Sequence, residues 1–260
     1  ADDRNKDIVS PVAAMLPAGE TLSEVHNDDI GLAFRTAADG TVSLAGLYRF
    51  LDLAEDHLAQ PQPALFSAEL SDADGRRLVL TADKGWGECR LQTTGEFERT
   101  ITWSDPEGDD LAGLKVTARV RLEGPRANWT LDIDNPSIRW GIRTVQFPRL
   151  HLRHRTLADG PGSCFTPRAS GVLHPNPAAG MKPFSGTYPS GWCSMQFGGY
   201  YDSEGGVYVA THDPVGSRKT VSFGPAEGAL ECSYTWDAPD TGVPGNDFTT
   251  SGECAVELFS

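Results

Sequence analysis

The sequence is short of basic residues and of long apolar runs, and both shortages exclude classes of partner. Its 260 residues contain 22 Lys and Arg against 36 Asp and Glu, a formal net charge of -14. A chain this acidic is repelled by phosphate backbones and anionic lipid surfaces, so we expect no nucleic acid and no membrane as partner. No apolar run approaches the roughly 18 residues that a membrane helix needs, which predicts a soluble protein.

Cysteine is also sparse, and its spacing argues against a metal site. The five cysteines (Cys89, Cys164, Cys193, Cys232 and Cys254) contain no CxxC pair, so neither a zinc site nor a redox pair is expected. We predict no metal and no cofactor. Two states stay open for the thiols, namely extracellular disulfides with one thiol left over, or buried free thiols. Ala1-Asp2-Asp3 is compatible with cleavage of a signal peptide, which predicts a secreted or periplasmic protein.

Helical periodicity is nearly absent, whereas strand periodicity recurs. The best helix candidate, residues 47–58, is short and has no convincing N-cap. In residues 114–122, by contrast, apolar and polar side chains alternate with period two, as on a half-buried strand. A turn at 123–126 and a second alternating segment at 129–134 complete an antiparallel hairpin.

The same strand–turn–strand pattern returns along the chain. Apolar alternation flanks Gly- and Asp-rich turns within residues 30–44, 66–80 and 201–211. Strands do not alternate with long helices, which excludes a (β/α)₈ barrel or a doubly wound sheet in these residues. We therefore predict an all-β protein that forms a large antiparallel β-sandwich.

One segment, residues 159–190, is unusually rich in Gly, Pro and Ser. Pro and Gly at this density oppose regular ladders and predict a long ordered loop over one face of the sheet. An ordered loop is preferred over a floppy excursion because aromatic and basic residues occur within it. Loops on a rigid β scaffold often carry binding residues.

A resemblance to a known family rests on an ordered series of short motifs. These are Phe147-Pro148-Arg149-Leu150, Phe165-Thr166-Pro167-Arg168-Ala169-Ser170-Gly171, His174-Pro175-Asn176-Pro177, Tyr188-Pro189, Ser194-Met195-Gln196-Phe197, Tyr200-Tyr201-Asp202, the stretch from Gly205 to Asp213, and Lys219. The series resembles the N-terminal β domain of bacterial glycoside-hydrolase-like proteins known as DUF6259, in which it precedes a catalytic barrel. The opening strands, residues 27–44, resemble those of galactose-mutarotase-like β-supersandwiches. The resemblance implies a supersandwich domain at 24–260 after an N-terminal extension at 1–23.

Sugar recognition needs flat apolar faces for the ring and directional polar groups for the hydroxyls. The Pro-rich segment and the strands after it supply both kinds of side chain. The predicted substrate-binding residues are Arg168, His174, Tyr188, Trp192, His212, Asp213 and Lys219. Two structural alternatives stay open: that Trp192 packs in the core, and that Asp213 before Pro214 only forms a turn. Catalytic residues stay unassigned, because 36 acidic residues allow too many carboxylate pairs to be nominated.

These features favour an accessory β-supersandwich domain of a glycoside hydrolase active in polysaccharide degradation. Such a domain contributes to carbohydrate binding or packs against a catalytic barrel, and it is not catalytic alone. Its expected partners are a neutral glycan and the barrel domain. Two alternatives stay open: a self-contained enzyme of the mutarotase or lyase type, and a free carbohydrate-binding module. The enzyme would require a His and a carboxylate within hydrogen-bond reach.

Overall fold

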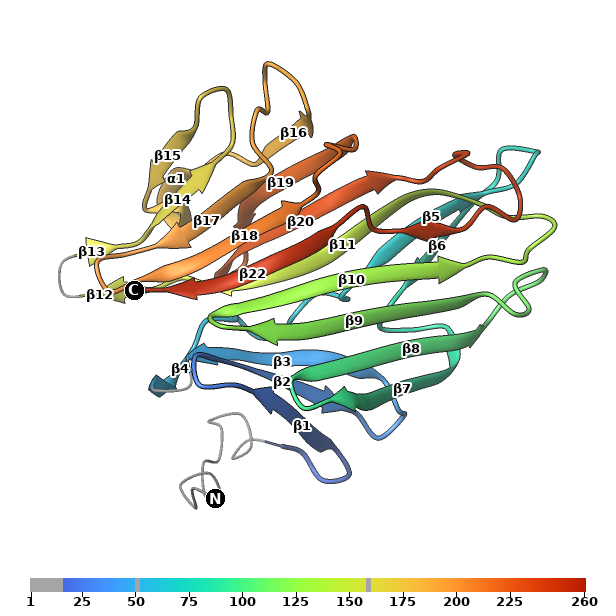
Figure 1. Ribbon diagram of the computed structural model, residues 1–260, viewed down its shortest axis with the longest axis horizontal. Coiled ribbons are helices and arrows are strands. Elements are labelled where there is room, and N and C mark those ends of the chain that lie inside the picture. The colour runs from blue at the N-terminus through green and yellow to red at the C-terminus, as the bar shows by residue number, and fades with distance from the viewer. Residues whose placement is uncertain (1–15, 50–51, 158–159) are drawn as a thin grey trace.

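The computed structural model describes residues 16–49, 52–157 and 160–260. Within these ranges the chain forms antiparallel strands and one short helix, α1 (Pro177–Gly180), which confirms the predicted all-β sandwich (Figure 1). The first strand, β1, spans Thr21–His26 and so begins inside the predicted N-terminal extension. Residues 1–15 of that extension lie outside the described residues.

A long sheet forms one layer of the sandwich. Its strands are β7 (Trp86–Gly95), β8 (Glu98–Pro106), β9 (Lys115–Glu123), β10 (Arg126–Asp134), β14 (Ser163–Thr166), β15 (Val172–Pro175), β17 (Phe197–Tyr201), β18 (Gly206–His212), β21 (Phe248–Thr249) and β22 (Glu253–Phe259). They follow the order β15-β14-β17-β18-β22-β10-β9-β8-β7, with β21 paired to β10. Strand β22 lies between β18 and β10 and thereby joins two halves of the sheet that are far apart in sequence.

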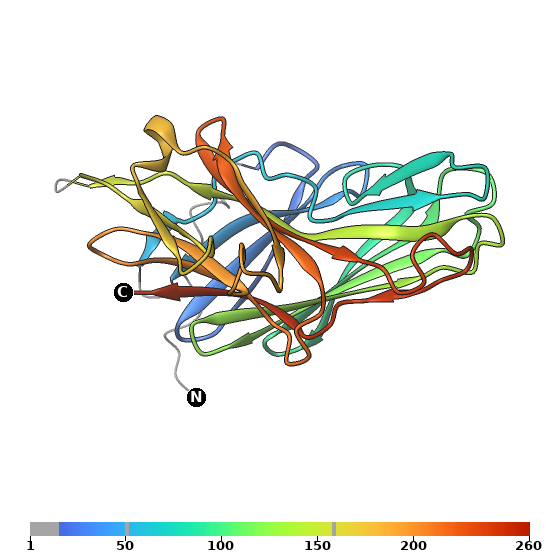
Figure 2. The same ribbon diagram turned by 90° about the horizontal axis from the view of Figure 1, so that it is seen from above.

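Two smaller sheets face the long one (Figures 1 and 2). The six-stranded sheet, in the order β16-β19-β20-β11-β5-β6, contains β5 (Ser67–Ser71), β6 (Arg77–Thr81), β11 (Gly141–Arg153), β16 (Phe184–Tyr188), β19 (Lys219–Ala226) and β20 (Ala229–Asp237). The four-stranded sheet contains β1, β2 (Ile30–Thr36), β3 (Val42–Arg49) and β4 (Asp52–Asp56), in chain order. A short ribbon pairs β12 (Thr156–Leu157) with β13 (Gly160–Pro161).

The core lies between the long sheet and the two smaller ones. Trp129 on β10 of the long sheet meets Phe34 on β2 at a ring-centroid distance of 6.0 Å and Phe147 on β11 at 6.3 Å. Phe66 and Trp103 meet edge to face at 5.0 Å. All five rings are buried. A single apolar core therefore holds all three sheets together, and burial of aromatic area on this scale dominates stability.

The alternating patterns account for the hairpins. On β9, Val116, Val120 and Leu122 are buried, whereas Arg119 and Arg121 on the other face are exposed. Strand β10 pairs with β9 in continuous register, as predicted for the hairpin at 114–134. The hairpins predicted within 30–44 and 66–80 are confirmed as β2–β3 and β5–β6. The turn predicted at 201–206 joins β17 to β18, and β18 contains the strand predicted after that turn.

The Pro- and Gly-rich segment at 159–190 differs from the expected long loop. It contains the strands β14, β15 and β16 as well as helix α1. Proline is tolerated because these strands are short and because β15 and β16 are edge strands, where a missing N–H costs no ladder bond. Pro175 is the last residue of β15, and Pro189 directly follows β16. Over its described residues, 160–190, the segment thus forms short strands at and next to the sheet edges, joined by turns, rather than one long loop.

The state of the cysteines decides between disulfides and buried free thiols. All five cysteines are free; Cys89 is partly buried and the other four are buried. The buried-thiol interpretation therefore holds in this structure, and the disulfide interpretation does not. Among the described helices none is long and apolar enough to cross a membrane.

Candidate functional site

The outer face of the long sheet carries a set of half-exposed aromatic side chains. On β18, Val207 and Val209 point into the core, while Tyr208 and His212 point outward, because successive side chains on a strand alternate between faces. Ala210 lies between Tyr208 and His212 on that outer face and opposite Phe197 of β17. The small alanine leaves room above the sheet between larger neighbours.

These side chains form a continuous row across three strands. The rings of Phe165 on β14 and Phe197 on β17 are stacked, with centroids 5.5 Å apart and an interplanar angle of 16°. Phe197 lies 5.6 Å from Tyr208, and Tyr208 lies 6.4 Å from His212. We call Phe165, Phe197, Tyr208 and His212 the aromatic row. Of these four side chains only His212 is exposed, and the other three are partly covered by packing.

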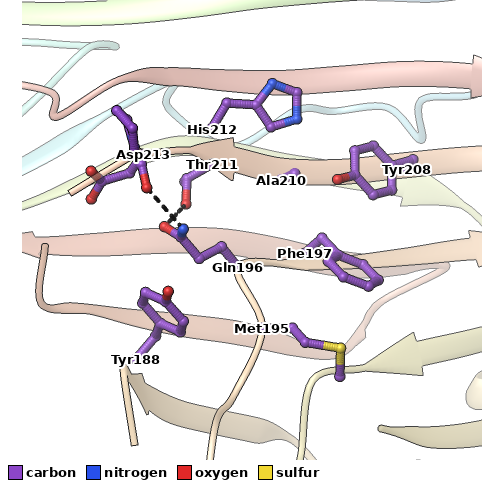
Figure 3. A pocket seen from close by; sticks show the side chains of 10 residues that line it. Tyr188, Met195, Gln196, Phe197, Tyr208, Ala210, Thr211, His212 and Asp213 are labelled. Carbon is purple, nitrogen blue, oxygen red and sulfur yellow. Dashed lines mark hydrogen bonds between the residues drawn. The ribbon is translucent and has the colours of Figure 1, made fainter. Parts of the chain in front are cut away.

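A groove of about 470 Å³ opens beside this row (Figure 3). Its lining residues are Tyr188, Met195, Gln196, Phe197, Tyr208, Ala210, Thr211, His212, Asp213 and Pro214. We call it the sheet groove. Its volume lies within the range of small-molecule sites, and its wall combines apolar rings with a few amide, hydroxyl and imidazole groups.

A buried ion pair supports one end of the sheet groove. The Lys219 and Asp213 side chains have no solvent exposure, and the Nζ of Lys219 lies 2.8 Å from Oδ2 of Asp213. Lys219 also donates to Oε1 of Gln196 at 2.6 Å, and its Nζ lies 4.9 Å from the centre of the Tyr188 ring and 4.8 Å from that of Trp236. The ammonium is therefore paired, hydrogen-bonded and enclosed by aromatic faces, as a buried charge must be.

The Asp213 carboxylate is saturated with donors. Oδ2 accepts from Lys219 and from the backbone N–H of Ser217, and Oδ1 accepts from the Ser251 hydroxyl and the N–H groups of Val215 and Gly216. Burial alone would raise the pKa of Asp213, but the bonds from Lys219 and Ser251 outweigh burial and lower it to about 2. Burial lowers the pKa of Lys219, an effect that Asp213 partly offsets.

This network fixes Gln196 at the groove wall. Its Oε1 also accepts from the Thr211 hydroxyl at 3.0 Å, and its Nε2 donates to the Asp213 carbonyl at 3.0 Å (Figure 3). Lys219 lies behind this wall, without access to solvent, so it can act on a ligand only by positioning Gln196 and Tyr188. Asp213, with its carboxylate occupied, is placed to hold the turn at 213–217.

Charged residues border the aromatic row on the side of β22 and β10. Tyr208 stands opposite Glu257, and His212 stands opposite Glu253 in the register of β18 with β22. Glu257 is held by Arg126, with 2.6 Å between Nη2 and Oε2, and Glu253 lies 3.4 Å from Nη2 of Arg121. The outer face thus changes from aromatic at β14–β18 to paired charges at β22–β9.

The site does not contain an assembled acid–base pair. Among the described residues, neither His212 nor His174 has a carboxylate within 4.0 Å, and no group of three or more His, Cys, Asp or Glu side chains could hold a metal ion. General acid–base catalysis requires such groups within hydrogen-bond reach of the substrate and of each other. The arrangement shown is suited to binding a ring against apolar and polar surfaces.

The predicted site residues separate into two places. Tyr188, His212 and Asp213 line the sheet groove, and Lys219 lies beneath its wall. Arg168, His174 and Trp192 line a second hollow of about 160 Å³. Trp192 is 51% exposed, which removes the alternative that it packs in the core.

Several groove residues were missed by the sequence reasoning. Phe197 and Tyr208 are half-exposed aromatics on the neighbouring strands β17 and β18, and neither was among the predicted binding residues. A usable signal existed, since Gly198 and Gly199 follow Phe197 directly and place no side chain next to it along the strand. Gln196 gave no signal, because its role comes from Lys219, which is 23 residues away.

Comparison with known proteins agrees with the fold. No family model and no curated protein matches the sequence. Among solved structures, a galactose mutarotase related enzyme of Lactobacillus acidophilus superposes with a TM-score of 0.58 at 10% identity, over 92% of this chain and 98% of its own. A putative aldose 1-epimerase of Escherichia coli K12 gives 0.53 at 12% identity, over 93% and 99%.

A third similar structure is a longer protein. The GH36 α-galactosidase of Geobacillus stearothermophilus, solved in complex with raffinose, superposes with a TM-score of 0.56 at 11% identity. The match covers 92% of this chain but only 41% of the α-galactosidase. At such identities the comparisons establish a galactose-mutarotase-like sandwich fold, and function must be argued from the site.

Proposed function

We propose that this chain is an accessory β-supersandwich domain of a glycoside hydrolase, of the DUF6259 type, that binds a neutral glycan in the sheet groove. The observation that carries the proposal is the aromatic row on the outer face of the long sheet. Phe197 and Tyr208 offer the flat apolar surfaces against which sugar rings pack, while Gln196 and His212 offer hydrogen bonds to hydroxyls.

The similarity to the α-galactosidase supports the accessory role. This fold occupies 41% of that longer protein, which shows that it occurs joined to other parts of a glycoside hydrolase. We therefore propose a catalytic barrel as the second partner and a secreted or periplasmic location, where polysaccharides are degraded.

The test of the binding site is the exchange Tyr208→Ala, measured by affinity electrophoresis on neutral glycans and by calorimetric titration with raffinose. Loss of the ring should weaken binding at least about fivefold, because a buried aromatic contact contributes on the order of 1 kcal/mol. The matched control is Phe97→Ala, which removes an aromatic side chain that is 40% exposed in the turn between β7 and β8, away from the groove. Equal affinities for the two variants would refute the site.

A second candidate is a self-contained mutarotase. It is favoured by the match over nearly the full length of the epimerase and the mutarotase related enzyme, and by the position of His212 opposite Glu253 on one face. Polarimetry of freshly dissolved α-galactose separates the two proposals. The accessory domain leaves the rate of mutarotation at the buffer value, whereas a mutarotase raises it and loses the increase on His212→Ala.

A further inference from the structure

The second hollow is basic, in contrast to the rest of the protein. Its lining residues are Arg168, His174, Lys182, Pro183, Phe184, Ser185 and Trp192, which we call the basic pocket. The chain as a whole has 36 acidic residues in 260, yet residues 160–201, which supply the entire pocket, contain none. The basic pocket is therefore locally positive because these 42 consecutive residues contain Arg168 and Lys182 but no Asp or Glu.

The Arg168 side chain is positioned by its contact with Trp192. Its guanidinium carbon lies over the Trp192 ring, 4.3 Å from the ring centre, in a cation–π contact. The backbone N–H of Ala169 donates to the Trp192 carbonyl at 2.8 Å and holds the two segments together. The N–H of Gly171 donates to the Arg168 carbonyl at 2.8 Å and closes the turn after Arg168. A guanidinium held by its face keeps its edge N–H groups free for bidentate bonds to an oxyanion.

The cations of the basic pocket have no carboxylate partner. Among the described residues, no acidic oxygen lies within 4.0 Å of Arg168 or Lys182, and both side chains are exposed. Arginines on the outer face of the long sheet differ, since Arg119, Arg121 and Arg126 are each paired with an acid. The charge of the basic pocket is thus available to a ligand from outside the chain.

His174 adds an oriented hydrogen-bonding group. Its Nε2 lies 3.1 Å from the hydroxyl of Thr166, a residue with no solvent exposure, so the ring orientation is set from the core side. Partial burial and the neighbouring Arg168 lower the pKa of His174. The imidazole is therefore neutral near pH 7 and can serve as a hydrogen-bond partner beside two cations.

We propose that the basic pocket binds the carboxylate of an acidic sugar, a hexuronate, within the glycan that the sheet groove holds by its neutral part. The identity of the ligand as a sugar rests on the proposed function, whereas the anionic site rests on the pocket itself. Arg168 binds the carboxylate through two N–H groups, Lys182 adds a point charge, and the exposed face of Trp192 packs against the ring. The loop after Tyr188 joins the two sites, since Tyr188 and Met195 line the sheet groove and Trp192 lines the basic pocket.

The test is an NMR titration that follows the indole N–H of Trp192, assigned with Trp192→Phe. The probes are trigalacturonate, its neutral methyl ester, inorganic sulfate and raffinose. Trigalacturonate should shift the Trp192 signal and bind at least about tenfold more tightly than the ester, since hydrogen bonds to charged groups are worth this much. Arg168→Gln should lose the same factor. The control Arg90→Gln removes one positive charge from an arginine that is 63% exposed on β7, and should change the affinity less than twofold.

The proposal would be overturned by no shift at the highest soluble concentration of trigalacturonate, by equal affinity for acid and ester, or by equal effects of the two arginine exchanges. Displacement of trigalacturonate by an equal concentration of sulfate would reject a uronate site in favour of a simple oxyanion site. Raffinose carries no carboxylate, so it tests the sheet groove separately from the basic pocket. Binding of trigalacturonate without raffinose binding refutes the sheet groove alone, and the converse refutes the basic pocket alone.

Discussion

The buried pair of Lys219 and Asp213 gives a sharp prediction for stability. Replacing Lys219 by Met removes the ammonium and leaves the carboxylate of Asp213 buried without its counter-charge. Breaking a buried pair from one side costs about 3–5 kcal/mol. Because Asp213 keeps bonds from Ser217, Ser251 and two further N–H groups, we expect the lower end, about 3 kcal/mol.

The dependence of stability on pH gives a second readout of the same pair. The pKa of Asp213 is about 2 in the folded protein against an ordinary 3.8, a difference worth about 2.4 kcal/mol at 1.36 kcal/mol per pKa unit. For a carboxyl with a depressed folded pKa, this stability is present above pH 3.8 and is lost as the pH falls toward 2. In Lys219→Met the pKa depression shrinks, so the variant should lose less stability than the wild type over that interval.

The assay is urea unfolding, followed by tryptophan fluorescence at pH 7 and at several values between pH 4 and 2. The matched control is Lys115→Met, which removes a lysine that is 48% exposed and 3.5 Å from Asp134, an exposed pair worth at most about 1 kcal/mol. Equal free energies of unfolding for the two variants at pH 7 would refute the reasoning, as would an unchanged acid dependence in Lys219→Met.

Two further predictions concern packing and thiol chemistry. A Cβ on Gly31 would lie 2.3 Å from the buried Tyr48 ring, so Gly31→Ala should lower the free energy of unfolding by about 1–3 kcal/mol. The control Gly180→Ala adds a Cβ that meets nothing within 4 Å and should change the free energy of unfolding by less than about 0.5 kcal/mol. Equal stability of the two variants would contradict the packing of Gly31 against Tyr48. With an aromatic disulfide reagent the folded protein should react at Cys89 alone, and slowly, because burial raises the pKa of the Cys89 thiol to about 11. In urea all five thiols should react. Fast reaction of Cys232 in the folded protein would contradict the burial of that thiol.

The fold was predictable wherever it rests on local pattern. The hairpin of β9 and β10 needs only alternating side chains and a short turn, and both are visible in ten or so residues. The position of β22 between β18 and β10 was not predictable, because pairing of strands about 50 and 130 residues apart in sequence leaves no local trace. The edge strands within 159–190 were missed because proline argues against strands in general and only tertiary context shows which strands are at an edge.

The candidate site was predictable in part. Aromatic and basic residues near turns pointed to Trp192, Arg168 and His174, and these do come together in the basic pocket. The role of Lys219 was not visible, since a lysine six residues after an aspartate resembles any pair of surface charges. Only the strand pairing that encloses it shows the ammonium to be buried between Tyr188 and Trp236. That Arg168, His174 and Trp192 contact a ligand directly stays a prediction.

Chemical-shift mapping with raffinose shows whether a neutral glycan binds in the sheet groove. Backbone amides of Phe197, Tyr208 and His212 should shift with a common saturation curve, while amides of β5 and β6 on the opposite layer stay unchanged. Shifts confined to other surfaces of the sandwich, or none at saturating raffinose, would refute binding in the sheet groove.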